Sequence, residues 1–287
     1  MKNSAVVLLV LAGLFLTGSS TLKSQDLTTG SIYEKENVPY RKPVPLPHLR
    51  EADVPWTKMI WRMVDLRQKM NHNLYFPTEP FGSRMSLIDV LVQAVENEEL
   101  SVYPNEEFRS GTELTLENVQ AELGAETTTQ TVVDVDTGEP VTVEIEGEAR
   151  TFEVRKYLIL EQWYFDSRHS SFGVRIVGLS PIRVYQRRDE QGNETEETLQ
   201  RQVFWVYYPD AREILARHEV FTRDNDLSNL SFDDLFLQRL FSGHIYQESN
   251  VYNNRRIEDY AMGRDALYEA QKIHNMIFDF EQDLWEY

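Results

Sequence analysis

The sequence predicts an α+β fold: an antiparallel sheet with packed helices, preceded by an extended N-terminal arm. The middle of the chain alternates apolar and polar residues with a period of two, in short segments joined by hairpin-length connections. Segments before and after it instead repeat apolar residues at helical spacing. We therefore divide the chain into a signal peptide (1–24), an extended Pro-rich arm (25–50) and a single α+β domain (51–287) with an acidic hairpin insertion at about 112–150.

The N-terminus has the pattern of a secretory signal peptide. Lys2 supplies a positive charge, Ala5 to Leu16 form an apolar stretch, and small residues follow. The stretch is shorter than the roughly 18 apolar residues of a membrane span, and no other segment approaches that length. We expect export, with cleavage between Ser19 and Gln25.

Composition narrows the class of protein. The 287 residues include no cysteine and carry a formal net charge of −18. Disulfides, thiol nucleophiles and thiolate metal sites are therefore excluded, and so is a lipid anchor on a cysteine, so a partner would have to hold the protein at a membrane. Nucleic acid and anionic lipid are poor partners for so acidic a chain, which favours basic surfaces instead.

The arm and the first helices come next in the chain. Four closely spaced prolines in 39–47 favour an extended strap, either a plain linker or an arm that lies on a neighbour. We expect a helix capped by Asp53, with Pro55 in its first turn. Its apolar face would be Trp56, Met59, Ile60, Met63 and Val64, and that of a second helix from Ser86 would be Leu87, Val90, Leu91, Ala94 and Val95.

The next segments are predicted to be mainly β-structure. From Thr112 to Glu148 the chain has no lysine or arginine, and two short apolar runs there flank a turn, which predicts a protruding acidic hairpin. We then expect strands at 157–165, at 172–176 and at 182–185 beyond Pro181. A charged turn is expected from Arg187 to Arg201, and a central strand from Val203 to Tyr208.

The last third is predicted to be helical. A short helix should run from Asp210 to Arg217, and Ser231 should cap another that carries Phe236, Leu237, Leu240, Phe241 and Ile245. A polar loop (250–256) precedes a long helix from Arg264. That helix is apolar over more than one stripe, so it is either deeply buried or docked against another subunit.

No segment forms a catalytic or metal-binding motif. The six histidines lack ligand spacing, and there is no nucleophile elbow or phosphate-binding glycine loop. Glu161 and Asp166 are the one carboxylate pair that suggests glycoside hydrolysis, which needs two such groups about 5–9 Å apart. Their five-residue offset places them on opposite faces of a regular strand. We therefore expect no catalytic residues, no cofactor and no metal.

Aromatic clusters are the remaining signal. Aromatic side chains fill ordinary cores, but they are also enriched at subunit interfaces. Together with prolines of the arm they give a set of candidate interface residues: Pro43, Pro45, Trp61, Trp163, Tyr164, Trp205, Tyr207, Phe280 and Trp285.

Several short segments, in this order, resemble the GldN/PorN family of Bacteroidota, components of the type IX secretion system and of gliding motility. The resemblance runs from about Arg50 to Tyr287. It is carried by the segments 50–54, 61–67, 163–166, 174–178, 204–209, 248–252 and 283–285.

The resemblance implies an architectural role. Family members assemble with an outer-membrane lipoprotein (GldK/PorK) into large rings at the periplasmic face of the outer membrane. They also meet the periplasmic part of the inner-membrane motor, GldL–GldM or PorL–PorM. We therefore expect a periplasmic ring subunit that is a homo-oligomer within the ring and has no membrane anchor of its own. The alternatives are a periplasmic glycan-acting hydrolase using Glu161 and Asp166, and a monomeric periplasmic binding protein.

Overall fold

The computed structural model describes residues 40–81, 84–125, 128–133, 140–145, 147, 149–188, 194–220 and 230–283. They belong to one unit, Lys35–Tyr287, which is described here by itself. The predicted signal peptide, the arm before residue 40 and Trp285 lie outside the described residues. None of the helices described is long and apolar enough to cross a membrane.

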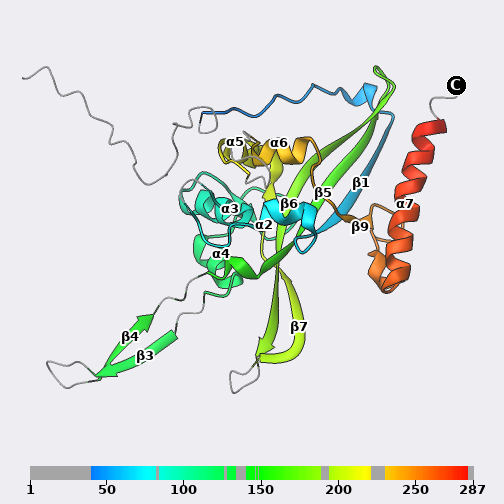
Figure 1. The fold of residues 1–287 in the computed structure, drawn as a ribbon. Coiled ribbons are helices and arrows are strands. Elements are labelled where there is room, and N and C mark those ends of the chain that lie inside the picture. Colours follow the sequence, from blue (N-terminus) through cyan, green and yellow to red (C-terminus); the bar gives the residue numbers. More distant parts are fainter. Residues whose placement is uncertain are drawn as a thin grey trace, which may run out of the picture. The chain divides into compact units, whose positions relative to one another are not determined.

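An antiparallel sheet of seven strands organises the fold, in the order β2–β8–β6–β5–β1–β9, with β7 also paired to β6 (Figure 1). The α+β prediction is thus confirmed. The strands are β1 (Trp56–Asp65), β2 (Val102–Tyr103), β5 (Val154–Asp166), β6 (Ser171–Arg188), β7 (Glu194–Gln202), β8 (Trp205–Tyr207) and β9 (His244–Glu248).

The helix predicted after Asp53 is wrong, because this segment is β1, a central strand. It pairs with β5 along its whole length, from Trp56 opposite Phe165 to Asp65 opposite Lys156, and with β9 on its other side. Residues 60–64 are buried without a break. A helix would bury only every third or fourth side chain, whereas a strand covered on both faces buries each in turn.

Other boundaries also differ from prediction. β6 continues through Pro181 as one strand. Part of the predicted charged turn is strand β7. The helix capped by Ser231 stops at Leu237, and Ile245 lies in β9 instead. Pairing with neighbouring strands defines β6, β7 and β9 in a way that local composition does not reveal.

Most of the predicted helices are present. They are α3 (Leu87–Glu96), α5 (Tyr208–Arg217), α6 (Phe232–Leu237) and α7 (Arg264–Asp283). Ser86 caps α3, and Ser231 with Asp234 forms a capping box at α6. Within the segment predicted as an acidic hairpin, β3 (Thr128–Val133) pairs with β4 (Pro140–Ile145), while its first part is helical instead. The short helices α2 (His72–Tyr75) and α4 (Leu116–Glu122) were not predicted.

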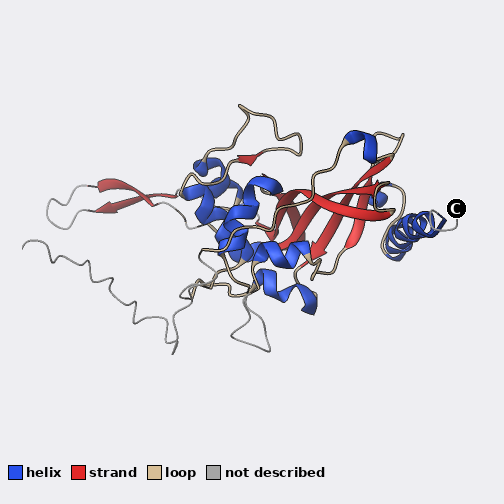
Figure 2. Cartoon of the chain, turned by 90° about the horizontal axis from the view of Figure 1, so that it is seen from above, coloured by secondary structure: helices blue, strands red, loops and turns tan. Residues whose placement is uncertain are grey.

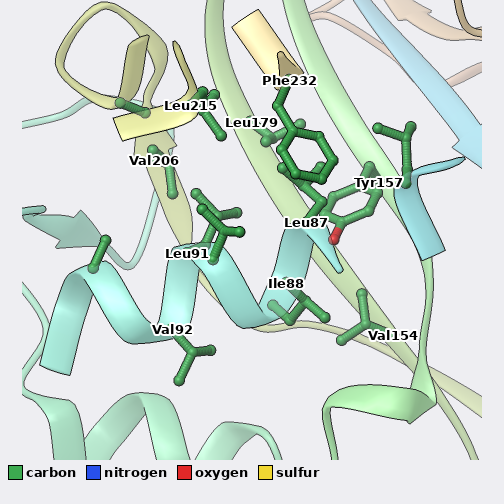
Figure 3. Packing of buried hydrophobic residues seen from close by; sticks show 14 of the residues in the cluster. Leu87, Ile88, Leu91, Val92, Val154, Tyr157, Leu179, Val206, Leu215 and Phe232 are labelled. Carbon is green, nitrogen blue, oxygen red and sulfur yellow. The ribbon is translucent and has the colours of Figure 1, made fainter. Parts of the chain in front are cut away.

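The main core lies between the sheet and the five helices α2 to α6. Leu87 and Leu91 of α3 pack toward Tyr157 and Leu179 of the sheet, and Phe232 of α6 closes the cluster (Figure 3). At the other end of the sheet, Ala270, Ile273 and Ile277 of α7 pack on β1 and β9. Figure 2 shows α7 apart from the group of helices over the main core.

The opposite face of the sheet is also covered. Trp61, Leu160 and Trp205 are buried there beneath the irregular segment that follows β2. Phe108 of that segment lies directly over Gly178, where an added Cβ would be 2.6 Å from the Phe108 ring. Glycine is therefore required at 178 for this segment to lie flat on the strands.

Candidate functional site

Glu161 is a buried charge rather than an open catalytic group. Its side chain has no exposed surface and accepts hydrogen bonds from Arg62 Nε (3.0 Å), Arg239 Nη2 (2.8 Å) and Trp163 Nε1 (2.9 Å). Arg62 also donates to the Gly243 carbonyl (3.0 Å). This cluster ties β1 and β5 to the segment between α6 and β9, so its geometry serves the fold.

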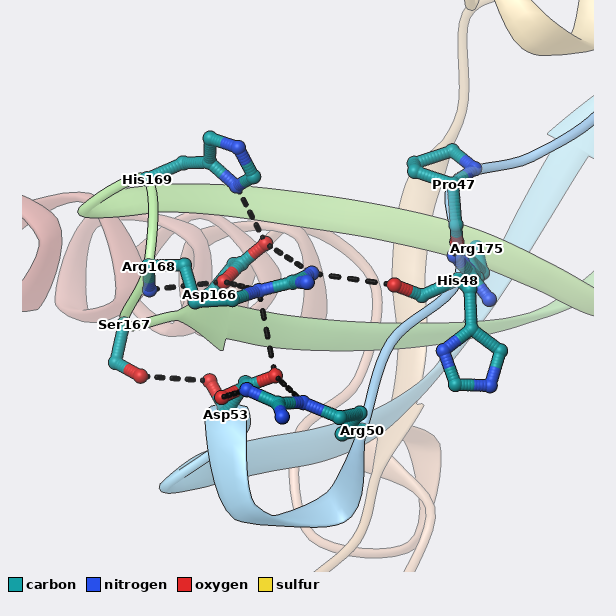
Figure 4. Close-up of polar contacts among 9 residues, drawn as sticks. All are labelled: Pro47, His48, Arg50, Asp53, Asp166, Ser167, Arg168, His169 and Arg175. Atoms are coloured by element: carbon teal, nitrogen blue, oxygen red, sulfur yellow. Dashed lines mark hydrogen bonds and ion pairs between the residues drawn. The ribbon is translucent and has the colours of Figure 1, made fainter.

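Asp166 lies in a second cluster, at the turn between β5 and β6 (Figure 4). Its carboxylate pairs with Arg168 (3.3 Å) and His169 (2.8 Å), and Arg168 also pairs with Asp53 (3.3 Å). Asp53 in turn accepts from Arg50 (2.7 Å). Glu161 is thus sealed in the core while Asp166 is engaged at the turn, and the structure does not bring the two together as a reaction centre.

The second cluster holds two carboxyl groups whose pKa values are lowered. Hydrogen bonds from Arg168 and His169 hold the pKa of Asp166 well below its usual range, and that from Arg50 lowers the pKa of Asp53. A carboxyl with a lowered folded-state pKa stabilises the fold above its unfolded pKa, about 3.9. That stabilisation is lost as pH falls through the folded value.

We therefore expect the free energy of unfolding to decline below about pH 4. In the Asp166→Asn variant, the free energy of unfolding should decline less steeply over the same pH range. Circular dichroism during acid titration, with the free energy of unfolding measured at several pH values, checks this. The same pH slope in both proteins below pH 4 would contradict a role for Asp166.

Residues 40–50, which we call the strap, lie along the domain (Figure 1). Four arginine contacts hold it. Arg41 pairs with Asp234 (2.8 Å), while Arg212 and Arg168 donate to the carbonyls of Val44 (2.7 Å) and His48 (3.1 Å). Arg175 donates to the carbonyl of Pro47. Since most of these contacts are to the backbone, several strap side chains remain exposed: Tyr40, Val44, Pro45 and Leu46.

The predicted interface residues have different environments. Trp61 and Trp205 are 5% and 3% exposed and belong to the core, so they offer no surface to a partner. Trp163, Tyr164, Tyr207 and Pro43 are half-buried. Phe280 on α7 is exposed at its edge and contacts Trp56 and Phe172 at centroid distances of 5.3 and 5.9 Å. An interface role for the other residues of the set stays a prediction.

Sequence reasoning missed the largest exposed apolar side chains near α7. Val251, Tyr252 and Met262 are 90%, 75% and 83% exposed, and Leu267 and Phe278 of α7 are also exposed. The segment 250–256 was predicted only as a polar loop, because its asparagines and arginines outweigh two apolar residues in composition. The sequence did contain one sign of an exposed apolar surface: Val251 and Tyr252 are adjacent in a turn that asparagines bound on both sides.

The part of the chain that the structure describes holds no group of three or more His, Asp or Glu side chains arranged to bind a metal ion. In comparisons with known proteins, a family model described as "Gliding motility associated protein GldN" matches residues 49–286. No curated protein matches the chain.

Proposed function

The chain belongs to the GldN family, whose members are components of gliding motility and type IX secretion, and we propose that it is a structural ring subunit of that machinery. The family match over 49–286 carries the proposal, because it spans almost the whole of the unit described above. GldN is a family of structural components and not a known enzyme family.

The proposal places the protein in the periplasm, at the outer membrane. The signal-peptide pattern of 1–24 supports export, and the absence of cysteine supports attachment through a lipidated partner. The partners we propose are the lipoprotein GldK/PorK, the periplasmic region of GldM/PorM and further copies of the same chain. The acidic character of the chain, with a net charge of −18, suits basic protein surfaces on those partners.

The hydrolase alternative gains no support from the carboxylates it needs. Glu161 is fully buried between two arginines, and Asp166 is held by Arg168 and His169. A substrate would have to break a buried ion cluster to reach Glu161, which is costly. We therefore propose a role without catalysis.

Native mass tests the proposed function. A tagged copy is extracted gently with the outer membrane, its mass is measured, and the chains that co-elute are identified. We expect a very large particle containing a lipoprotein and many copies of this chain. A lone subunit would contradict the ring proposal and support the monomeric binding protein instead.

A further inference from the structure

A rigid loop between β9 and α7 presents two apolar side chains to solvent. The Asn250 side-chain oxygen accepts hydrogen bonds from the backbone N–H groups of Tyr252 (3.0 Å) and Arg255 (3.3 Å). The backbone N–H of Asn250 donates to the side-chain oxygen of Asn254 (3.1 Å). Asn254 lies in the left-handed region, with φ at +53°. The backbone is thereby fixed, so Val251 and Tyr252 are held outward in a set position.

Neighbouring residues enlarge this apolar surface. Arg255 donates to the Asp259 carbonyl (2.9 Å) and lies over the Tyr260 ring at 4.8 Å, which brings the loop against the segment before α7. Met262 follows, almost fully exposed. We call this surface the tip, and it comprises Val251, Tyr252, Arg255, Arg256, Tyr260, Met262 and Arg264.

The tip differs in charge from the rest of the chain. Its three arginines form no ion pair among the residues that the structure describes. Segment 250–264 holds only two acidic residues, Glu258 and Asp259. One oxygen of the Asp259 carboxylate accepts from the Arg256 N–H (3.1 Å). In a chain of net charge −18, this segment carries a small positive excess.

The opposite edge of the sheet is strongly acidic. Strand β2 is at one end of the strand order and β9 is at the other. Around β2, residues 96–117 contain seven glutamates and a single basic residue, Arg109, which pairs with Glu107 (3.2 Å). Glu106 accepts a hydrogen bond from Trp61 and Glu107 pairs with Arg109. We call the five other glutamates of this segment, all of them exposed, the acidic edge: Glu96, Glu98, Glu99, Glu113 and Glu117.

Each edge strand already has a backbone contact with a neighbouring segment of its own chain. The Leu114 N–H donates to the Val102 carbonyl of β2 (2.8 Å), and Gln247 of β9 bridges to Arg256. Contacts at these two edges therefore have to be made by side chains rather than by strand addition.

We propose that the tip of one copy docks on the acidic edge of the next copy of this chain. An exposed apolar centre rimmed by exposed arginines that form no ion pair within the described part of the chain fits an acidic surface, and arginine and tyrosine are typical of energetically dominant interface positions. Two different surfaces at opposite ends of one sheet make a head-to-tail contact, which generates a ring or an open series of copies. The inference rests on the proposed ring function and names the contact within it.

Chemical cross-linking tests the contact directly, because the chain has no cysteine to give a background. Two differently tagged variants, Val251→Cys and Glu99→Cys, are produced in the same cells and treated with a short bismaleimide before extraction. We expect a cross-linked dimer that carries both tags. The matched control pairs Met70→Cys with Glu99→Cys, since Met70 is also exposed but lies outside both surfaces.

The outcomes separate this inference from the proposed function. One outcome is a large native particle in which positions 251 and 99 are not cross-linked, or in which position 251 is cross-linked to itself. That result overturns the head-to-tail contact and leaves the ring function standing. A lone subunit in the outer-membrane extract overturns both. A Val251–Glu99 product that exceeds the Met70 control supports the contact.

A charge exchange gives an independent check. Arg255→Glu and Glu99→Arg should each reduce the yield of the large particle. For a well-placed interface charge, we expect each change to weaken the apparent affinity between copies roughly tenfold. The two changes combined in one chain should restore it, since each copy then offers a reversed but complementary pair. If the double variant instead lost as much of the particle as the two single variants together, the proposed contact between Arg255 and Glu99 would be overturned.

Discussion

Glu161→Gln is expected to lower the free energy of unfolding by about 3–5 kcal/mol. The change keeps the shape of the side chain but leaves the buried Arg62 and the partly exposed Arg239 beside a neutral group. Removing one partner of a buried ion cluster is costly, because the charge of Arg62 stays desolvated without its compensating carboxylate. Urea denaturation followed by tryptophan fluorescence measures the effect.

The matched control for that variant is Glu213→Gln. Glu213 pairs with Arg217 at 2.6 Å across one turn of α5, and both side chains are exposed. The expected loss there is about 0.3–0.5 kcal/mol, since water screens the pair. If the two variants unfolded at the same urea concentration, the Glu161 cluster would not contribute as its burial indicates.

Arg212→Ala is expected to cost about 3–5 kcal/mol and also to loosen the strap. Arg212 binds both oxygens of the buried Asp233 (2.9 and 3.0 Å) and donates to the Val44 carbonyl. Without it, the Asp233 carboxylate keeps only the Tyr208 hydroxyl (3.0 Å) as a partner among the described side chains. Urea denaturation gives the loss of stability, and trypsin cleavage at Arg41 under native conditions reports release of the strap.

Arg168→Ala separates the two effects of Arg212→Ala. It removes the contact to the His48 carbonyl, but Asp53 and Asp166 keep Arg50 and His169 as partners. We expect a loss of no more than about 1 kcal/mol, because Arg168 is partly exposed. Equal losses of stability in Arg212→Ala and Arg168→Ala would contradict the importance given to the buried Asp233.

Several elements were predictable because their signals are local. The apolar stripe of α3, the Ser231 cap of α6 and the start of α7 at Arg264 follow from spacing and capping chemistry within one segment. The family resemblance was also carried by the sequence, and the match over 49–286 confirms it.

The candidate site could not be predicted in the same way. Glu161 meets Arg62 and Arg239 across 99 and 78 positions of sequence, and no local pattern indicates such a pairing. The tip was missed for a related reason: whether Val251 and Tyr252 are buried or exposed depends on what packs beside the loop. Exposure is a property of the folded surface and not of the segment.

The sequence by itself determined the α+β class, the Ser231 cap, the two short strands of the acidic segment and the family, because each depends on residue type and spacing along the chain. Only the tertiary structure decided that residues 56–65 form a strand, since helix and strand periodicities both fit that apolar run. Hydrogen bonding to β5 and β9 on either side settled it. The strand order likewise placed the acidic edge and the tip at opposite ends of one sheet, because pairing between distant segments fixes which surfaces a chain presents.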